Sequence, residues 1–380
     1  MQAKKLRKKE GARQWVDFPT LVLTLLLALF GTAMIFSAGA PYAEARYEDS
    51  GYFIKRQLIW LAIGIAVMLL ASQVGTAFYK KISPYLYVIT LILLLLVLII
   101  GVVGNGAKRW ISIGPLTIQP SEIAKLAVIM MLAHYFSNHD TAREKLNKAE
   151  IFKYGTLFPL LLLLVPIIMI MLQKHLSCII IIGLLGLILI IASGVDTRYI
   201  RGFCIFGIAF VLAFALFTDY TKERILVWQN PEAYKLTGGW QTLQGLMAIG
   251  SGGLFGLGYG NSVMKHCYVS EPANDMIFAI LCEELGLFGA LAAILLFILL
   301  IARAYTVSLR CRDTFARLLG IGIGTKMALQ VLLNIAVVTN SIPNTGISLP
   351  FFSYGGSSLI MLFFEMGLLL SISKESIIQK

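Results

Sequence analysis

The stretch that decides the fold is "YLYVITLILLLLVLIIGVVG", residues 85–104. It holds 20 residues without a charge, the length that a helix needs to cross about 30 Å of hydrocarbon. Other apolar runs of similar length recur along the 380-residue chain, which is 58% hydrophobic with a mean hydropathy of +0.81. The sequence therefore predicts an all-α polytopic membrane protein, with residues 1–380 forming a single membrane domain.

About ten transmembrane helices are expected. Their predicted ranges are 17–38, 54–74, 84–104, 119–137, 155–173, 175–193, 198–217, 276–302, 315–339 and 354–373. Residues 1–16 form a basic tail with six Lys or Arg residues. If this tail is cytoplasmic, 20 of the 32 Lys and Arg residues face the cytoplasm, as the positive-inside rule requires. Both termini are then cytoplasmic, and the net charge of +12 reflects topology and not nucleic-acid binding.

The unusual sequence is expected on the outer face. A large extracytoplasmic loop, residues 218–275, joins the seventh and eighth spans, and its mixed apolar and polar stretches predict short amphipathic helices that lie on the membrane and cover a cavity. Within it, "GSGGLFGLGYG" (250–260) has no GK[ST], which excludes a P-loop and leaves a flexible re-entrant or surface loop. "NSIPNTGISLPFFSYGGSS" (340–358) interrupts helix at membrane depth, which is tolerated only inside protein or beside a cavity.

Three carboxylates lie in or beside the eighth span: Asp275, Glu283 and Glu284. On a straight helix Glu283 lies about 12 Å along the axis from Asp275, beyond the roughly 5–9.5 Å that separates the paired carboxylates of glycosidases. Asp275 either complements the dipole at the helix start or serves a site in the outer cavity. The two glutamates are expected to be internal supports that pair with Lys326 or other polar groups of the bundle.

Charged residues also precede the fourth span. Lys108, Arg109 and Trp110 fit either an interfacial aromatic with snorkelling cations or a phosphate clamp. Glu122 and Lys125 are spaced i, i+3, which predicts an ion pair that shapes a cavity, with direct ligand contact as the alternative. The five cysteines include no CxxC, and the four histidines have no metal-ligand spacing, so neither predicts a metal site.

Four motifs resemble the SEDS family of bacterial cell-wall proteins (RodA, FtsW, SpoVE). They are "GAKRWISIGPLTIQPSEIAK", "AIGSGGLFGLGYGNS", "NDMIFAILCEELGLFG" and "NIAVVTNSIPNTGISLPFFSYGGSS", in the family's order, within a likeness that runs from about residue 20 to residue 373. The resemblance implies a ten-span bundle in the bacterial cytoplasmic membrane that polymerises lipid II into glycan strands on the outer face. It also implies a class B penicillin-binding protein as partner, in elongation, division or sporulation.

The resemblance also assigns residues. The family's essential aspartate falls on Asp275, and its other motif positions fall on Arg109, Trp110, Glu122, Lys125 and Arg224. Many members read "QPDLGT" where this chain reads "QKHLSC" (173–178), so that His175 replaces an aspartate. This departure weakens any proposal that a carboxylate at that turn binds metal.

The implied reaction moves the growing glycan from an undecaprenyl-pyrophosphate carrier to the 4-hydroxyl of a second lipid II. Asp275 would act as base or metal anchor. Lys108, Arg109 and Arg224 would neutralise the pyrophosphate, with Mg²⁺ or Mn²⁺ as an expected cofactor. Two alternatives stay open: a lipid II flippase or other transporter, and a non-catalytic scaffold for a transpeptidase. Transporters tend to have internal repeats and midplane sites, whereas this chain shows no repeat and concentrates its unusual residues at one face.

Overall fold

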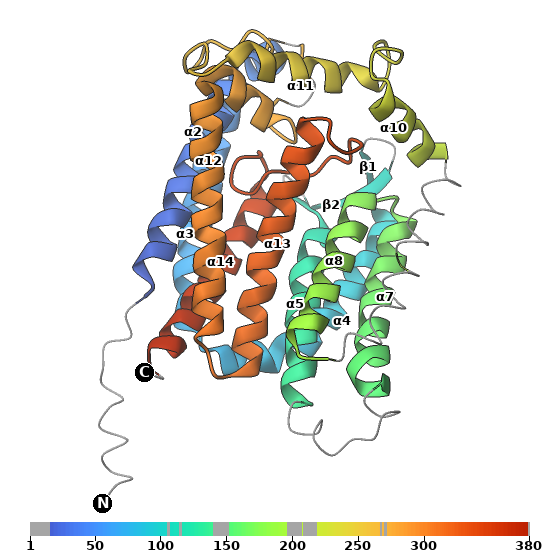
Figure 1. The fold of residues 1–380 in the computed structure, drawn as a ribbon, viewed down its shortest axis with the longest axis vertical. Coiled ribbons are helices and arrows are strands. Elements are labelled where there is room, and N and C mark those ends of the chain that lie inside the picture. Colours follow the sequence, from blue (N-terminus) through green and yellow to red (C-terminus); the bar gives the residue numbers. More distant parts are fainter. Residues whose placement is uncertain are drawn as a thin grey trace, which may run out of the picture.

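The computed structural model describes residues 16–104, 107–113, 116–139, 152–195, 207, 219–266, 268–269 and 272–378. Its helices are α2 (Phe18–Tyr47), α3 (Tyr52–Gln73), α4 (Thr76–Ile100), α5 (Pro120–Asn138), α7 (Phe158–Leu172, continuing a π-helical turn η2, Lys153–Leu157), α8 (Leu176–Ala192), α10 (Asp219–Gln229), α11 (Gly239–Gly252), α12 (Ile277–Leu309), α13 (Thr314–Val338) and α14 (Gly356–Ile378). The predicted helical membrane bundle is confirmed (Figure 1).

Seven of the described helices are long and apolar enough to cross a membrane, and α8 is a shorter apolar helix. Every predicted span overlaps a described helix except 198–217, which lies outside the described residues apart from Gly207. Two boundaries were clearly wrong: α4 begins at Thr76, eight residues before the predicted start at 84, and α2 ends at Tyr47, nine residues after the predicted end at 38. Each helix accommodates a proline in its interior, Pro84 in α4 and Pro41 in α2. The count of ten therefore stays a prediction.

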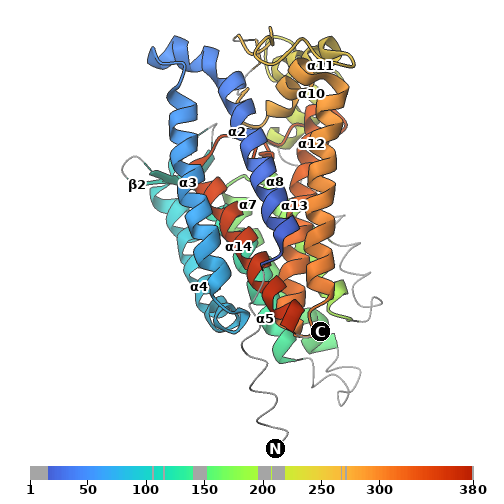
Figure 2. The same cartoon turned by 90° about the vertical axis from the view of Figure 1, so that its left-hand side faces the viewer.

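Small residues let the long helices pack closely. A Cβ at Gly64 of α3 would lie 2.3 Å from the Phe363 ring of α14, and one at Gly367 of α14 would lie 2.6 Å from the Met68 carbonyl of α3. Such close approach is the usual way in which membrane helices gain van der Waals contact, because lipid supplies no hydrophobic force between them. These two helices cross side by side through the bundle (Figure 2).

The two ends of the bundle differ. α10 and α11 lie across one end, and the start of α2 and the end of α14 meet at the other (Figure 1). There Asp17 caps α2 by accepting from the Thr20 amide at 3.1 Å, and Arg303 of α12 pairs with its carboxylate. The amide of Asp17 also donates to Ser373 at 3.3 Å. The large loop therefore contains helices, as predicted, while their position on the outer membrane surface and the cytoplasmic side of the termini stay predictions.

A small antiparallel sheet, which the sequence analysis did not predict, follows α4. Its strands are β1 (Val102–Gly104), β2 (Ala107–Ile113) and β3 (Leu116–Ile118), in the order β1-β2-β3. Val103 is paired with Lys108, and Ser112 with Thr117. The all-α assignment is confirmed, with this one short β element beside the helices.

α12 is broken near its outer end. Gly286 has φ 64° and ψ −164°, so residues 277–285 form a short helix and the long helix starts after it. A Cβ at Gly286 would lie 2.4 Å from the Gly256 nitrogen, so only glycine fits both the backbone angles and the close approach. The straight helix assumed for the eighth span was therefore wrong, and the loop after α11 occupies the break.

Candidate functional site

Asp275 immediately precedes the N-cap of α12 and is held by its backbone. The Asn334 side-chain amide of α13 donates to the Asp275 carbonyl at 2.9 Å and to the Ile347 carbonyl at 2.6 Å. On the N-terminal side, Ser353 donates to the Asn274 carbonyl at 2.8 Å, and the Tyr354 amide donates to the Ala273 carbonyl at 2.8 Å. The irregular segment 340–355, which we call the α13–α14 loop, therefore fixes the main chain around Asp275 while the carboxylate stays half-buried.

Other elements converge on the same loop. Arg224 of α10 donates to the Asn344 carbonyl, and the Asn344 side-chain amide donates to Gln241 of α11 at 3.2 Å. At the N-terminus of α8, Ser177 donates to the Thr345 carbonyl. The predicted site residues Asp275 and Arg224 are thus brought to one loop, although 51 positions separate them in the sequence.

Gly346 lies against the carboxylate. A Cβ there would lie 3.6 Å from Asp275 Oδ2, and the residue has φ 65°, in the left-handed region that favours glycine. Gly346 is itself exposed, so the carboxylate has an open approach on this side.

The predicted Glu122–Lys125 ion pair is confirmed, with Nζ and Oε1 2.7 Å apart in the first turns of α5. Lys326 of α13 pairs with Glu365 of α14 instead of with Glu283 or Glu284, so that part of the prediction was wrong. Both pairs are enclosed in the bundle, where ionisable groups are costly unless they are paired. Glu122 and Lys125 therefore have a structural partner each, and their contact with a ligand stays a prediction.

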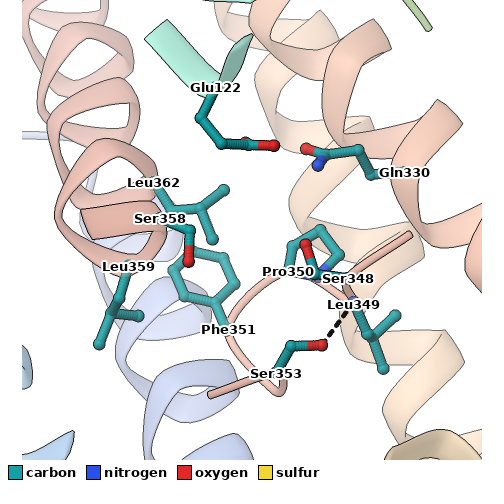
Figure 3. Close-up of a pocket in the computed structure, with 10 residues that line it drawn as sticks. All are labelled: Glu122, Gln330, Ser348, Leu349, Pro350, Phe351, Ser353, Ser358, Leu359 and Leu362. Carbon is teal, nitrogen blue, oxygen red and sulfur yellow. Dashed lines mark hydrogen bonds between the residues drawn. The ribbon is translucent and has the colours of Figure 1, made fainter. Parts of the chain in front are cut away.

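A small cavity separates Glu122 from the α13–α14 loop. Glu122 and Gln330 point toward one another across it, and Ser348, Ser353 and Ser358 complete its polar wall (Figure 3). Its volume of about 10 Å³ accommodates about one water molecule. The cavity is too small for a sugar, so it is not itself a substrate pocket.

The predicted cations Lys108 and Arg109 are neighbours on β2. Successive residues of a strand point to opposite faces, which separates Lys108 and Trp110 from Arg109. Arg109 donates to the Lys174 carbonyl at 2.6 Å, at the C-terminal end of α7, whereas Lys108 and Trp110 are exposed. Arg109 thus contacts the end of a helix through only some of its five N–H donors, and the joint grip of Lys108 and Arg109 on one pyrophosphate stays a prediction.

His175 lies in the turn between α7 and α8. It is buried, and its Nδ1 lies 3.3 Å from the Ser121 hydroxyl, beside the start of α5. In the described part of the chain, no group of three or more His, Cys, Asp or Glu is arranged to hold a metal ion. Any cation at this site would need Asp275 together with ligands from the substrate.

Comparison with known proteins decides the family. Residues 17–377 match the model of the FtsW, RodA and SpoVE group, described as a cell cycle protein family. This chain belongs to that family. It is 38% identical to the stage V sporulation protein E of Bacillus subtilis over 95% of this chain and 97% of that protein. It is 35% identical to the probable peptidoglycan glycosyltransferase FtsW of Geobacter metallireducens over 97% of each.

A solved structure agrees with these relatives. A chain from a study of polymerization and crosslinking by a peptidoglycan synthase complex superposes with a TM-score of 0.78 at 25% identity, covering 95% of this chain and 98% of that one. The family assignment drawn from the four sequence motifs is confirmed. The long coverage means that the likeness extends over the whole membrane bundle, including the α13–α14 loop and α12.

The sequence analysis missed several residues that hold the site. Asn334 and Ser177 donate to backbone carbonyls, the Asn344 side chain accepts from the Gly346 amide at 3.1 Å, and Gly346 leaves space beside the carboxylate. Polar residues of these kinds are common in loops, so residue type alone did not distinguish them. The signal available was "PNTGIS" itself, a Pro, Asn and Gly cluster at membrane depth, which predicts a buried irregular backbone in need of such partners.

Proposed function

We propose that this protein is a peptidoglycan glycosyltransferase that polymerises lipid II on the outer face of the bacterial cytoplasmic membrane, with Asp275 as general base. The observation that carries the proposal is the arrangement of Asp275, whose main chain is fixed by Asn334 and Ser353 while Gly346 leaves its carboxylate approachable. The relatives named as peptidoglycan glycosyltransferases support the reaction class.

The reaction requires a base for the acceptor hydroxyl and a cation that neutralises the pyrophosphate leaving group. In glycan transfer the acceptor 4-hydroxyl attacks the anomeric carbon, the bond from that carbon to the pyrophosphate oxygen breaks, and the hydroxyl proton passes to a base. A positioned carboxylate supplies about 10² to 10⁴-fold in such a step. Arg224 of α10 is the proposed cation, because it donates to the Asn344 carbonyl, two residues from Gly346 in the α13–α14 loop.

A divalent cation is part of the proposal. Mg²⁺ usually binds through one or two carboxylates together with substrate phosphates, and does not need a cage of protein ligands. Asp275 is half-exposed next to the exposed Gly346, which fits this mode. The cation would neutralise developing charge on the pyrophosphate.

The test is polymerisation of lipid II by purified protein. Asp275→Asn, which preserves size and the backbone contacts, is expected to lower the rate at least about 100-fold, and EDTA to abolish wild-type activity until Mg²⁺ or Mn²⁺ is restored. Normal polymer from a folded Asp275→Asn variant would refute the assignment. Movement of lipid II across vesicles without polymer would indicate a flippase instead.

A transpeptidase of the penicillin-binding class B type is proposed as partner. The structural neighbour comes from a study of a synthase complex that coordinates polymerization and crosslinking, which supports a partner that crosslinks. Co-purification with the class B protein encoded in the same genome, and polymerisation with and without it, tests the pairing. A rate that does not change on addition of a stably bound partner would argue against a functional complex.

A further inference from the structure

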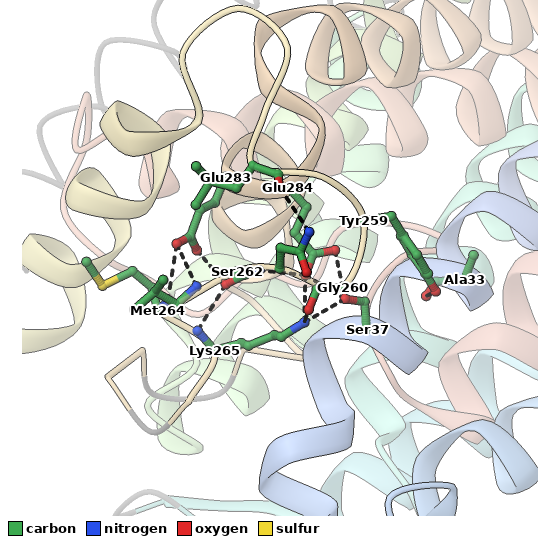
Figure 4. A network of polar contacts seen from close by, with 12 residues as sticks. Ala33, Ser37, Tyr259, Gly260, Ser262, Met264, Lys265, Glu283 and Glu284 are labelled. Atoms are coloured by element: carbon green, nitrogen blue, oxygen red, sulfur yellow. Dashed lines mark hydrogen bonds and ion pairs between the residues drawn. The ribbon is translucent and has the colours of Figure 1, made fainter.

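A buried polar network joins the short helix of α12 to α2 and to the loop that follows α11. Glu284 is fully buried and accepts from Ser37 of α2 at 2.6 Å and from Lys265 Nζ at 2.8 Å (Figure 4). Lys265 Nζ also donates to Ser37 at 3.0 Å and to the Gly260 carbonyl at 2.6 Å. The ion pair thus connects three separate segments of the chain at one point.

Glu283 fastens the same loop from the other side. Its carboxylate accepts from the Val263 amide at 2.9 Å, from the Met264 amide at 3.3 Å and from the Ser262 hydroxyl. A carboxylate that accepts from successive backbone amides is a strong, charge-assisted contact. The expectation that the two glutamates are buried supports is confirmed, but they support the outer loop and not the middle of the bundle.

The glycine-rich stretch 250–260 completes the end of the short helix. The amides of Leu257 and Gly258 donate to the carbonyls of Glu283 and Glu284 at 3.0 and 2.9 Å. A Cβ at Gly256 would lie 2.1 Å from the Glu284 carbonyl oxygen, so the backbones touch directly. This stretch was expected to be a flexible loop, and the structure shows it as the cap that satisfies the carbonyls left free by the break at Gly286.

The loop is also tied to α2 through its aromatic residue. Tyr259 donates its hydroxyl to the Ala33 carbonyl at 2.7 Å. Burial, with a contribution from the Glu284 carboxylate, raises the pKa of Tyr259, so the hydroxyl remains a donor through the neutral range. The loop 253–266 is therefore attached both to α2 and to the short helix of α12.

The short helix connects this network to Asp275. Residues 277–285 span about two and a half turns, with Asp275 just before one end and Glu283 and Glu284 at the other. A rigid rod of this length passes any tilt or rotation at its far end to its near end. Substrate chemistry is sensitive to such shifts, since misplacement by about 1 Å can cost about 10²-fold in rate.

We propose that Lys265 and Glu284 are positioning residues for Asp275, which they orient by locking the far end of the short helix to α2. The proposal rests on the proposed base role of Asp275. Neither residue touches the reacting atoms; they restrict the directions from which the carboxylate meets the acceptor hydroxyl. Their loss should therefore lower kcat for lipid II polymerisation and leave KM nearly unchanged.

The experiment compares Lys265→Met, Glu284→Gln and Ser37→Ala in the full-length protein. We expect kcat to fall at least about 10-fold in the first two and about threefold in Ser37→Ala, which keeps the ion pair and so is the variant that folds most readily. Hydrogen–deuterium exchange should become faster in residues 277–285 in all three variants. Arg303→Met is the matched control, because it removes an ion pair between the same two helices, α2 and α12, at the opposite end.

The control should lose thermal stability and keep kcat within about twofold of wild type. Folded Lys265→Met and Ser37→Ala proteins with wild-type kcat, beside an inactive Asp275→Asn, would overturn the positioning role and leave the proposed function intact. Unchanged exchange in 277–285 would also overturn it. An active Asp275→Asn variant would refute the base assignment instead. Hydrogen–deuterium exchange in residues 277–285 would still test whether Lys265 and Glu284 hold the short helix to α2.

Discussion

Neutralising the Glu122–Lys125 pair tests how the bundle tolerates charge. Lys125 is 2% exposed and Glu122 is 15% exposed, so the two single changes are not equivalent. Glu122→Gln leaves a fully buried ammonium without its nearest anion. Lys125→Met leaves a carboxylate that retains contact with water. The first change is therefore expected to be the more destabilising of the two.

The magnitude follows from the geometry. At 2.7 Å and an effective dielectric constant of about 20, two unit charges attract by about 6 kcal/mol, most of it offset by desolvation. Removing one partner of a buried pair costs about 3–5 kcal/mol, which we expect for Glu122→Gln. A carboxylate with access to water loses less, about 1–3 kcal/mol, which we expect for Lys125→Met. The double variant removes both charges and should be more stable than Glu122→Gln alone.

Thermal unfolding of the purified proteins in one detergent measures the effect, with lipid II polymerisation as the second readout. Lys55→Met is the control, because Lys55 and Asp49 form an exposed pair at 2.8 Å whose loss should not shift the melting temperature. Reversal of both charges, Glu122→Lys with Lys125→Glu, should recover part of the activity lost by either single reversal. Recovery will be incomplete, because a cation is disfavoured at the N-terminus of α5. Equal melting temperatures for both neutralised single variants would refute the reasoning.

Two further predictions concern glycines. Gly286→Ala places a Cβ 2.4 Å from the Gly256 nitrogen and requires a backbone conformation that costs about 1–3 kcal/mol for a residue other than glycine. The melting temperature of this variant should therefore fall sharply. Gly183→Ala is the control, because its Cβ would meet open space and the melting temperature should not change. An unaltered Gly286→Ala protein would contradict the break in α12. Gly346→Ala crowds the Asp275 carboxylate, so polymerisation should fall more than stability; a rate that follows the melting temperature alone would count against an open approach to Asp275.

The bundle could be predicted because its signal is local. Each long apolar run predicts a membrane-spanning helix by itself, and the Glu122–Lys125 pair lies within one helical turn. Neither prediction therefore needed knowledge of the fold. The site was predictable only in part. Asp275 and Arg224 came from motif resemblance, and their meeting on one loop depends on contacts between segments that the sequence does not order in space.

The errors share one cause, which is backbone geometry set by tertiary contact. The straight eighth span overlooked that Gly286 would admit a second backbone conformation, and the pairing of Lys326 with Glu283 or Glu284 assumed that both glutamates faced the interior of the bundle. In the structure the break directs both glutamates to Ser262 and Lys265, and Glu365 takes Lys326. A glycine-rich stretch that fits against another chain segment looks, in sequence, the same as a mobile one.

The α13–α14 loop also has a consequence for biogenesis. Asp275 is translated before Asn334, Asn344, Gly346 and Ser353, which later determine where its main chain lies. Ribosomes must therefore deliver almost the entire polypeptide, and the translocon must release α13 and α14, before the site exists in its final form. A nascent or prematurely terminated chain contains Asp275 but lacks the α13–α14 loop that fixes its main chain. Activity therefore cannot begin until membrane insertion is complete.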